Sequence, residues 1–159
     1  MKNRLEQQFV EGDAVAFLRE VSQLSNCHSR KIGALLIRDR EAISFGFNTP
    51  LIKHESGVCP RKEMGFKSGE GLKYCPAIHA EQDAIMRGLR EVGAKLVEES
   101  TLWCLCGYPC PECAKIIITA GIRSVVGVES SDWDDTEYNF SLTKKMFEEN
   151  GVSFRLERE

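Results

Sequence analysis

The chain has 159 residues, of which 42% are hydrophobic and 28% are charged. This composition is typical of a globular protein. The length predicts one domain over residues 1–159 and is too short for a second full domain. The formal net charge is -3 at pH 7, and because proteins that bind the phosphate backbone usually carry a basic surface, we do not expect nucleic acid as a partner. No apolar run approaches the roughly 18 residues of a membrane-spanning helix, so no membrane association is expected.

The first half of the chain predicts one helix, two strands and a long insert. Apolar residues recur at helical spacing from 4 to 24, with a break near Gly12. Segments 33–39 and 42–48 are rich in β-prone residues, and their closeness predicts a hairpin. Residues 49–74 contain two prolines, four glycines and five lysines or arginines. An insert of this length in a compact domain is usually functional or held in place by something.

The second half predicts alternating helices and strands. Helical periodicity covers 77–90, and 100–108 is a candidate for a buried strand. A helix over 111–121 should end at Gly121, and it is followed by a strand over 123–129. A helix over 139–151 and a last edge strand over 152–157 complete the order. This order predicts an α/β fold, a three-layer α-β-α sandwich around a mixed sheet of roughly five strands.

The cysteine content points to metal binding. The chain carries seven cysteines and three histidines. Its first residues include no apolar run of the kind found in signal peptides, so we expect a cytoplasmic protein in which thiols stay reduced. Cys110 and Cys113 form a C-x-x-C pair, a spacing shared by redox pairs, structural zinc sites and catalytic zinc sites.

His79 and Glu81 decide between these uses of the C-x-x-C pair. Catalytic zinc commonly has three protein ligands and one open position, and one histidine with two cysteines is an accepted set. His79 and the C-x-x-C pair both stand at predicted helix starts, where the positive helix end stabilises thiolates. The order H-x-E and then P-C-x-x-C is typical of zinc nucleobase deaminases, in which the glutamate moves protons without binding the metal.

With these motifs the chain resembles the cytidine and deoxycytidylate deaminase superfamily from about Ser25 to Val152, and its deoxycytidylate (dCMP) branch most closely. The resemblance rests on the stretches SNCHSRKIGALLIRD, SFGFNTP, CPAIHAEQDAI and PCPECAKIIITAGI. Cytidine deaminases proper tend to have cysteine in place of His79, and tRNA adenosine deaminases usually have a more basic surface. Thr49 and Asp83 depart from the glycine and the asparagine that are common in the branch.

The resemblance implies hydrolysis of dCMP to dUMP and ammonia, with one catalytic zinc on the three ligands and with Glu81 as the proton carrier. It also implies that Asn48 hydrogen-bonds the sugar and that the helix start at Ala80 lines the pyrimidine pocket. The alternatives are a deaminase of dCTP or of another small aminated heterocycle, a tRNA or single-strand deaminase, and a zinc-binding module that has lost its activity.

The remaining cysteines near the insert allow two interpretations. In some relatives a second, structural zinc clasps the insert, and the resemblance places Cys27, Cys59 and Cys75 at cysteine positions of that site. A structural zinc normally takes four ligands, and the fourth would be His54 or His28. His54 is favoured because it lies in the insert itself. The alternative is a set of reduced thiols without a metal.

Recognition of a phosphate would need several converging donors. Arg30 and Lys31 stand near the phosphate end that the resemblance implies, and the insert offers four further cations: Lys53, Arg61, Lys62 and Lys67. The sequence does not show which of them converge. Tyr108 is expected either to stack on the base or gate the site, or to pack in the core. Trp133 is expected either to stack on a base or to pack at a subunit interface.

Two further expectations concern the core and the assembly. Cys104 and Cys106 are expected to be core residues, on opposite faces of a strand. Small members of the superfamily are commonly oligomeric, with neighbouring subunits closing each other's sites, so a homo-oligomer is predicted. Some relatives are regulated by dCTP and dTTP, and no feature of this sequence decides whether the same holds here.

Overall fold

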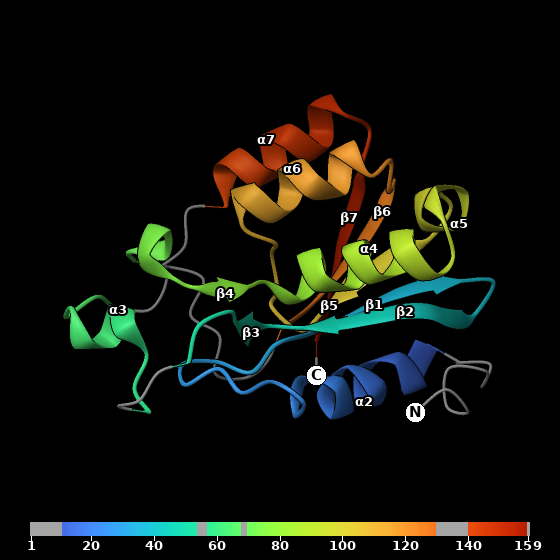
Figure 1. The fold of residues 1–159 in the computed structure, drawn as a ribbon. Helices are drawn as coiled ribbons and strands as arrows, with labels where there is room; N and C mark the ends of the chain where they lie inside the picture. The colour runs from blue at the N-terminus through green and yellow to red at the C-terminus, as the bar shows by residue number, and fades with distance from the viewer. Residues whose placement is uncertain (1–10, 54–56, 68–69, 130–139, 159) are drawn as a thin grey trace.

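The computed structural model describes residues 11–53, 57–67, 70–129 and 140–158, and its centre is a mixed sheet (Figure 1). The strands are β1 (Gly33–Arg38), β2 (Glu41–Phe47), β5 (Thr101–Cys104), β6 (Ser124–Glu129) and β7 (Ser153–Arg158). They lie in the order β2-β1-β5-β6-β7. Strand β1 is antiparallel to both of its neighbours, whereas β5, β6 and β7 are parallel.

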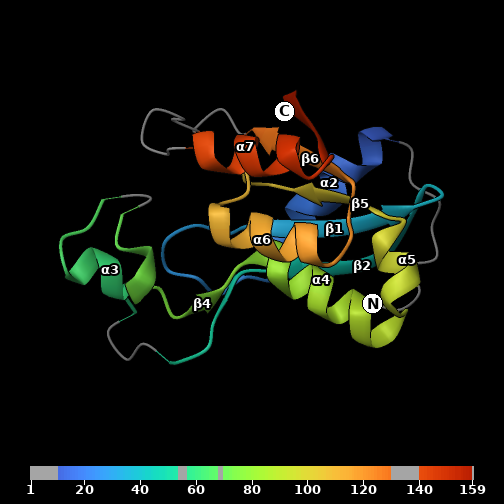
Figure 2. The same ribbon diagram turned by 90° about the horizontal axis from the view of Figure 1, so that it is seen from above.

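Helices cover both faces of this sheet (Figures 1 and 2). One face carries α2 (Glu11–Ser22), and the other carries α4 (Ala80–Glu91), α5 (Ala94–Glu98), α6 (Pro111–Thr119) and α7 (Ser141–Glu149). The predicted α/β fold, a three-layer sandwich around five strands with β7 at the edge, is thereby confirmed. Within the described ranges, no helix has the length and apolarity needed to cross a membrane.

Strand β1 contributes side chains to two hydrophobic cores, one on each face of the sheet, because it lies inside the sheet. Successive side chains of a strand point to opposite faces. Leu35 therefore packs with Leu18 of α2 and with Trp103, whereas Leu36 packs with Ile85 of α4 on the other face. Leu35 and Leu36 are fully buried, and burial of each such side chain contributes about 1.5–3 kcal/mol. The apolar run of β1 therefore holds both helical layers.

The β1–β2 hairpin follows from its turn residues. Asp39 and Arg40 have φ values of 50° and 69°, and a two-residue type I′ turn requires positive φ at both central positions. Arg38 and Glu41 pair directly beyond the turn. The predicted hairpin is confirmed, with strand bounds that shift by one residue.

The insert contains short elements of its own. Strand β3 (Thr49–Pro50) pairs with β4 (Ala77–Ile78), and between them lie α3 (Pro60–Glu63) and the 3-10 turn η1 (Leu72–Tyr74). The insert lies on the side of the molecule where α4 begins (Figure 1). The rings of Phe66 and Tyr74 stack with centroids 5.6 Å apart. Local contacts of this kind hold the segment together.

Within the described residues, two boundaries differ from the sequence-based expectation by three residues or more. Helix α4 begins at Ala80 and not at residue 77, because β4 occupies the two positions before His79. Strand β5 ends at Cys104 and not at residue 108, because the chain turns at Gly107, which has a φ of 63°. This turn lies so close to β6 that a Cβ at Gly127 would meet the Gly107 carbonyl oxygen at 1.8 Å. Helix α5 has no counterpart among the predicted elements.

Candidate metal centre and active-site cavity

One histidine and two cysteines meet where α4 and α6 begin. His79 directly precedes α4, Cys110 directly precedes α6, and Cys113 lies in the first turn of α6. Nδ1 of His79 lies 3.3 Å from Sγ of Cys113 and 3.4 Å from Sγ of Cys110. All three ligand atoms lie within 4.8 Å of one another. The structure thus brings together the three residues that the sequence predicts as zinc ligands.

The distances between these atoms suit a zinc ion. In a tetrahedral site with bonds of about 2.0 Å to nitrogen and about 2.3 Å to sulfur, the nitrogen and sulfur ligands are roughly 3.5 Å apart. The two nitrogen–sulfur distances of 3.3 and 3.4 Å are close to that value. A set of one histidine and two cysteines also leaves a fourth position open, as a catalytic zinc requires. The residues present therefore fit the ion.

The pKa values of the three ligands indicate which of them carry a proton that a metal ion would displace. The hydrogen bond from Cys113 lowers the pKa of Cys110 to about 4, and contact with His79 adds to this effect. Hydrogen bonds to Cys110 and Cys75 raise the pKa of His79 to about 11. The hydrogen bond to Cys110 and burial raise the pKa of Cys113. A divalent cation competes with the protons on His79 and Cys113 for the same electron pairs.

The starts of the two helices hold the ligands in place. The backbone N–H of His79 donates to Oε1 of Gln82 at 3.3 Å, which satisfies a donor at the first turn of α4. Pro111 is the first residue of α6, where the missing proline N–H leaves no hydrogen bond unmade. Cys110 and Cys113 are three residues apart, so their side chains lie on the same face of that turn.

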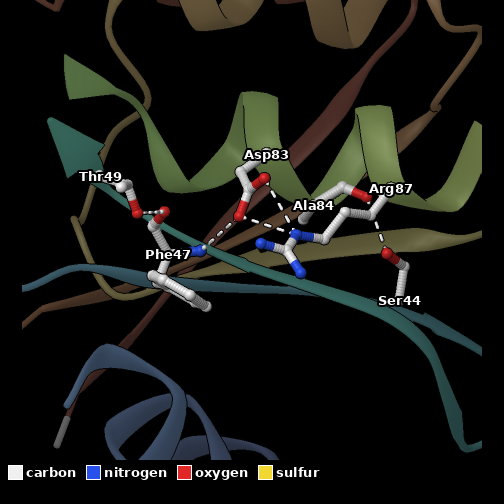
Figure 3. A network of polar contacts seen from close by, with 6 residues as sticks. All are labelled: Ser44, Phe47, Thr49, Asp83, Ala84 and Arg87. Atoms are coloured by element: carbon white, nitrogen blue, oxygen red, sulfur yellow. Dashed lines mark hydrogen bonds and ion pairs between the residues drawn. The ribbon is translucent and has the colours of Figure 1, made fainter. Parts of the chain in front are cut away.

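A polar network fastens α4 to β2 (Figure 3). The backbone N–H of Phe47 donates to Oδ2 of Asp83 at 3.2 Å, and Nε of Arg87 lies 3.0 Å from the same carboxylate oxygen. Oγ of Ser44 donates to the carbonyl oxygen of Ala84 at 2.8 Å. Asp83, one of the departures from the branch, therefore joins the first turns of α4 to the neighbouring strand.

Glu81 lies in the first turn of α4 and is 4% exposed. Sγ of Cys106 donates to its Oε1 at 3.4 Å. A hydrogen bond with Cys104, burial and the nearby charge of Glu81 raise the pKa of Cys106, so the thiol keeps the proton that it donates. Glu81, the candidate proton carrier, is thus a buried carboxylate that accepts a hydrogen bond from a thiol.

The prediction for Cys104 and Cys106 is wrong in its geometry. Both residues are buried, as expected, but the ligand atoms of Glu81, Cys104 and Cys106 lie within 4.8 Å of one another. Residues two apart in an extended strand point to the same face, so the spacing itself favours neighbouring side chains, and the chain turns directly after Cys104, where β5 ends. The sequence signal for this turn is Gly107, which directly follows Cys106.

A cavity of about 110 Å³ lies beside the metal centre, and His79, Glu81 and Cys110 line it. Its wall also contains four of the residues that the sequence predicts for substrate binding: Arg30, Asn48, Ala80 and Tyr108. Lys31 is exposed and lies outside this wall.

Asn48 holds a segment of the cavity wall in place. Its Oδ1 accepts the backbone N–H of Ile32 at 2.8 Å, and its Nδ2 donates to the carbonyl oxygen of Arg30 at 2.7 Å. The residue is 7% exposed. An amide has two donors and two acceptor lone pairs, so one of each remains beyond these two bonds. The predicted contact with a sugar stays a prediction.

Tyr108 is part of an aromatic cluster and also lines the cavity. Its ring centroid lies 4.2 Å from that of Phe154 and 5.0 Å from that of Phe140. Nζ of Lys144 lies 4.7 Å from the Tyr108 ring. Packing on several sides makes this ring a fixed part of the wall. Trp133 lies outside the described residues.

The three cysteines predicted to bind a second zinc lie at the cavity and in the insert. Cys27 and Cys75 line the active-site cavity, and Cys59 is buried directly before α3. Among the residues that the structure describes, these three do not form a group of ligands like that of His79. Cys75 instead hydrogen-bonds with His79, which lowers the pKa of the Cys75 thiol. His54 lies outside the described residues, and the second zinc stays a prediction.

Known proteins resemble the chain in sequence. A family model for the cytidine and deoxycytidylate deaminase zinc-binding region matches residues 12–129. The deoxycytidylate deaminase of Saccharomyces cerevisiae is 31% identical over 131 residues, which are 77% of this chain and 40% of that protein. The deoxycytidylate deaminase of a Mycobacterium phage is 32% identical over 113 residues, which are 66% of this chain and 83% of that protein. The chain thus spans about 40% of the length of the yeast relative.

Solved structures resemble it in fold. The dCMP deaminase of the cyanophage S-TIM5 in apo form has a TM-score of 0.64 and 23% identity, over 92% of this chain and 95% of that chain. At this identity the likeness shows the fold alone. The family model, in contrast, covers well over half of the chain and includes His79, Glu81, Cys110 and Cys113. The chain therefore belongs to the family of proteins that share the cytidine and deoxycytidylate deaminase zinc-binding region.

Proposed function

We propose that this protein is a zinc-dependent hydrolase that converts dCMP to dUMP and ammonia. The observation that carries the proposal is the cavity that the metal centre shares with the buried Glu81. Relatives named deoxycytidylate deaminase support the choice of substrate. The presence of the carboxylate argues against a zinc-binding module without activity. The seven unpaired cysteines fit a reducing compartment, and we place the enzyme in the cytoplasm.

The residues of the cavity supply the steps of a hydrolytic deamination. Bound zinc lowers the pKa of water and so supplies a nucleophile near neutral pH. Glu81 takes a proton from the attacking water and delivers it to the pyrimidine, whose amino group leaves as ammonia. A carbon–oxygen bond forms at carbon 4 of cytosine, and the carbon–nitrogen bond to the amino group breaks. Ala80 lines the base, and Asn48 keeps one donor and one acceptor for the sugar.

A panel of substrates tests this function. Ammonia release by the purified, zinc-loaded enzyme should be measured with dCMP, CMP, dCTP, deoxycytidine and cytosine, and we expect the highest kcat/KM for dCMP. Glu81→Gln keeps the size of the side chain and should bind zinc normally, but kcat should fall by about 10²–10⁴-fold because proton transfer is lost. A zinc-loaded E81Q variant as fast as the wild type would refute the role of Glu81. A holoenzyme that turns over none of the five would refute the function.

We infer further that the chain forms a homo-oligomer. Leu51, Ile52 and Met86 are 73%, 59% and 50% exposed, and Leu51 and Met86 border one shallow depression. Exposed apolar groups that lie together often mark an interface. Light scattering should therefore give a mass that is a multiple of 17.9 kDa, and a monomer at micromolar concentration would contradict this inference. The same measurement with dCTP or dTTP added tests for an allosteric response.

A further inference from the structure

The insert places one buried cation in the wall of the active-site cavity. Arg61 belongs to α3 and is 9% exposed, although arginine is almost never buried unless it is paired. It lines the same cavity as His79 and Glu81. The other cations of the insert, Lys53, Lys62, Lys67 and Lys73, are exposed and lie outside this wall.

The guanidinium of Arg61 has a donor to spare. Nη1 donates to the carbonyl oxygen of Glu70 at 2.6 Å, which anchors one end of the group. Nε is buried and has no hydrogen-bond partner in the described part of the chain. A buried donor without an acceptor is unfavourable, and native structures contain few of them. An acceptor that arrives with a ligand would satisfy this N–H.

The charges around the cavity favour an anionic ligand at the Arg61 side. Arg30 and Arg61 line the cavity, and Glu81 is the one carboxylate among the described lining residues. Its Oε1 accepts a hydrogen bond from the thiol of Cys106 beside the metal centre. Arginine remains charged at every relevant pH. Two arginines and one carboxylate therefore line this cavity, and the carboxylate already accepts a hydrogen bond.

We propose that Arg61 binds the 5′-phosphate of the nucleotide, so that the insert makes the site select nucleoside monophosphates over nucleosides. This inference rests on the proposed deamination of dCMP and names the residue that recognises its phosphate. A guanidinium presents its N–H groups in a planar fork that matches phosphate oxygens. The Nε–H of Arg61 is the donor without a partner, and because it is buried, the guanidinium would have to turn toward the cavity to make this contact.

The insert holds Arg61 in position before a ligand arrives. The backbone N–H of Phe66 donates to the carbonyl oxygen of Arg61 at 2.9 Å. The backbone N–H of Lys67 donates to the carboxylate of Glu70 at 2.9 Å, and the carbonyl of Glu70 in turn accepts from Arg61. A side chain that is ordered in advance loses less entropy on binding. The folded insert thus serves as a preorganised arm for the phosphate.

Matched variants test the proposal. Arg61→Gln and Lys62→Gln each remove one positive charge from α3, but Lys62 is exposed and lies away from the cavity. In zinc-loaded R61Q we expect kcat/KM for dCMP to fall roughly 100-fold, mainly through KM, because a charge-assisted contact is lost. The kcat/KM for deoxycytidine should stay within about twofold of the wild-type value. K62Q should leave both values unchanged, and Arg61→Lys should lie between R61Q and the wild type.

Equal losses with dCMP and deoxycytidine, or no loss with either, would overturn the proposal, because a purely structural role cannot distinguish the two substrates. Circular dichroism and zinc content report whether R61Q folds. If it does not fold, the same comparison with R61K decides. If the wild type turns over neither substrate, the proposed function fails on its own. Titration of wild type and R61Q with inorganic phosphate then tests Arg61: weaker binding by R61Q supports the proposal, and equal binding overturns it.

Discussion

At the scale of single residues, Glu81, the proposed proton carrier, accepts a hydrogen bond from a thiol. Sγ of Cys106 donates to Oε1 of Glu81 at 3.4 Å, and the raised pKa of Cys106 keeps this proton in place at neutral pH. A thiol is a weak donor. It can therefore orient the carboxylate and still leave the carboxylate oxygens able to accept a proton from water. In the proposed reaction, Cys106 would act through Glu81, as a positioning residue.

Removal of this donor should slow the reaction without weakening substrate binding. Cys106→Ala should lower kcat for dCMP by roughly tenfold at nearly constant KM, because a net hydrogen bond of about 1–1.5 kcal/mol is lost. Cys106→Ser restores a donor and should recover most of the rate. Steady-state kinetics on zinc-loaded protein checks both values. A serine variant as slow as the alanine variant would show that Cys106 acts through its volume and not through its hydrogen bond.

The metal ligands could be predicted from the sequence, whereas the proposed phosphate-binding residue could not be singled out. His79, Cys110 and Cys113 stand in the order and spacing of a known zinc-binding signature. Arg61 looks like the neighbouring Lys62 in the sequence, and what separates them is burial. That burial arises from contacts within the folded insert, and a periodic pattern does not encode such contacts. The same limit applies to the thiol that faces Glu81.

At the scale of elements, the start of α4 lies closer to β2 than a side chain would allow. A Cβ at Gly46 would lie 2.2 Å from the backbone nitrogen of Ala84 and 2.5 Å from the carbonyl oxygen of Ala80. Those atoms belong to the turns that carry Glu81 and follow His79. Gly46 therefore sets the depth of the helix start against the sheet, and the network of Figure 3 holds it there.

An added methyl group at this contact should damage both stability and metal binding. Gly46→Ala should cost about 1–3 kcal/mol of unfolding free energy, because backbone must move to make room, and the displaced helix start should bind zinc more weakly. Ser44→Ala is the matched control: it removes the hydrogen bond to Ala84 without adding atoms and should cost about 1 kcal/mol at unchanged zinc affinity. Thermal unfolding and zinc titration measure the two effects. A G46A variant with wild-type zinc affinity would contradict this account of α4.

The ends of helices and strands depend partly on long-range contacts, which local sequence patterns do not encode. The hairpin strands were predicted to within one residue, because their alternation and their turn are local features. The start of α4 was not, because Ala77–Ile78 pair with Thr49–Pro50 across the whole insert. Periodicity in the sequence extends into residues 77–78, but strand pairing takes them out of the helix. Long-range contacts of this kind decide the ends of elements and, with them, the position of His79.

At the scale of the whole molecule, the metal centre depends on segments that are far apart in the chain. Helix α4 follows the insert, α6 follows β5, and the two helices pack together on one face of the sheet (Figure 2). Their first turns therefore meet, and the partial positive charge at each helix start favours thiolates there. In α/β proteins, ligands commonly bind beyond the carboxyl ends of strands, and β5 ends shortly before Cys110.

Zinc binding to the whole chain should release about two protons at pH 7. His79, with its pKa raised to about 11, and Cys113, with its raised pKa, hold protons at pH 7, whereas Cys110, with a pKa of about 4, does not. Because zinc binds the deprotonated ligands, its affinity should fall as the pH falls, by about 100-fold per pH unit near neutrality. Calorimetric titration of the zinc-stripped protein in buffers of different ionisation enthalpy measures the number. A release near zero would contradict this protonation state.

The same titration counts the metal sites of the molecule. The described residues hold one ligand group that contains a histidine, which accounts for one zinc per chain, and the predicted structural zinc would raise the ratio to two. Cys110→Ser should lose that zinc, and Cys59→Ser should keep it. A ratio near two that falls to one in C59S would instead show that the insert holds the predicted structural zinc. Since Cys59 directly precedes the helix that carries Arg61, such a metal would also fix the position of the phosphate-binding arm.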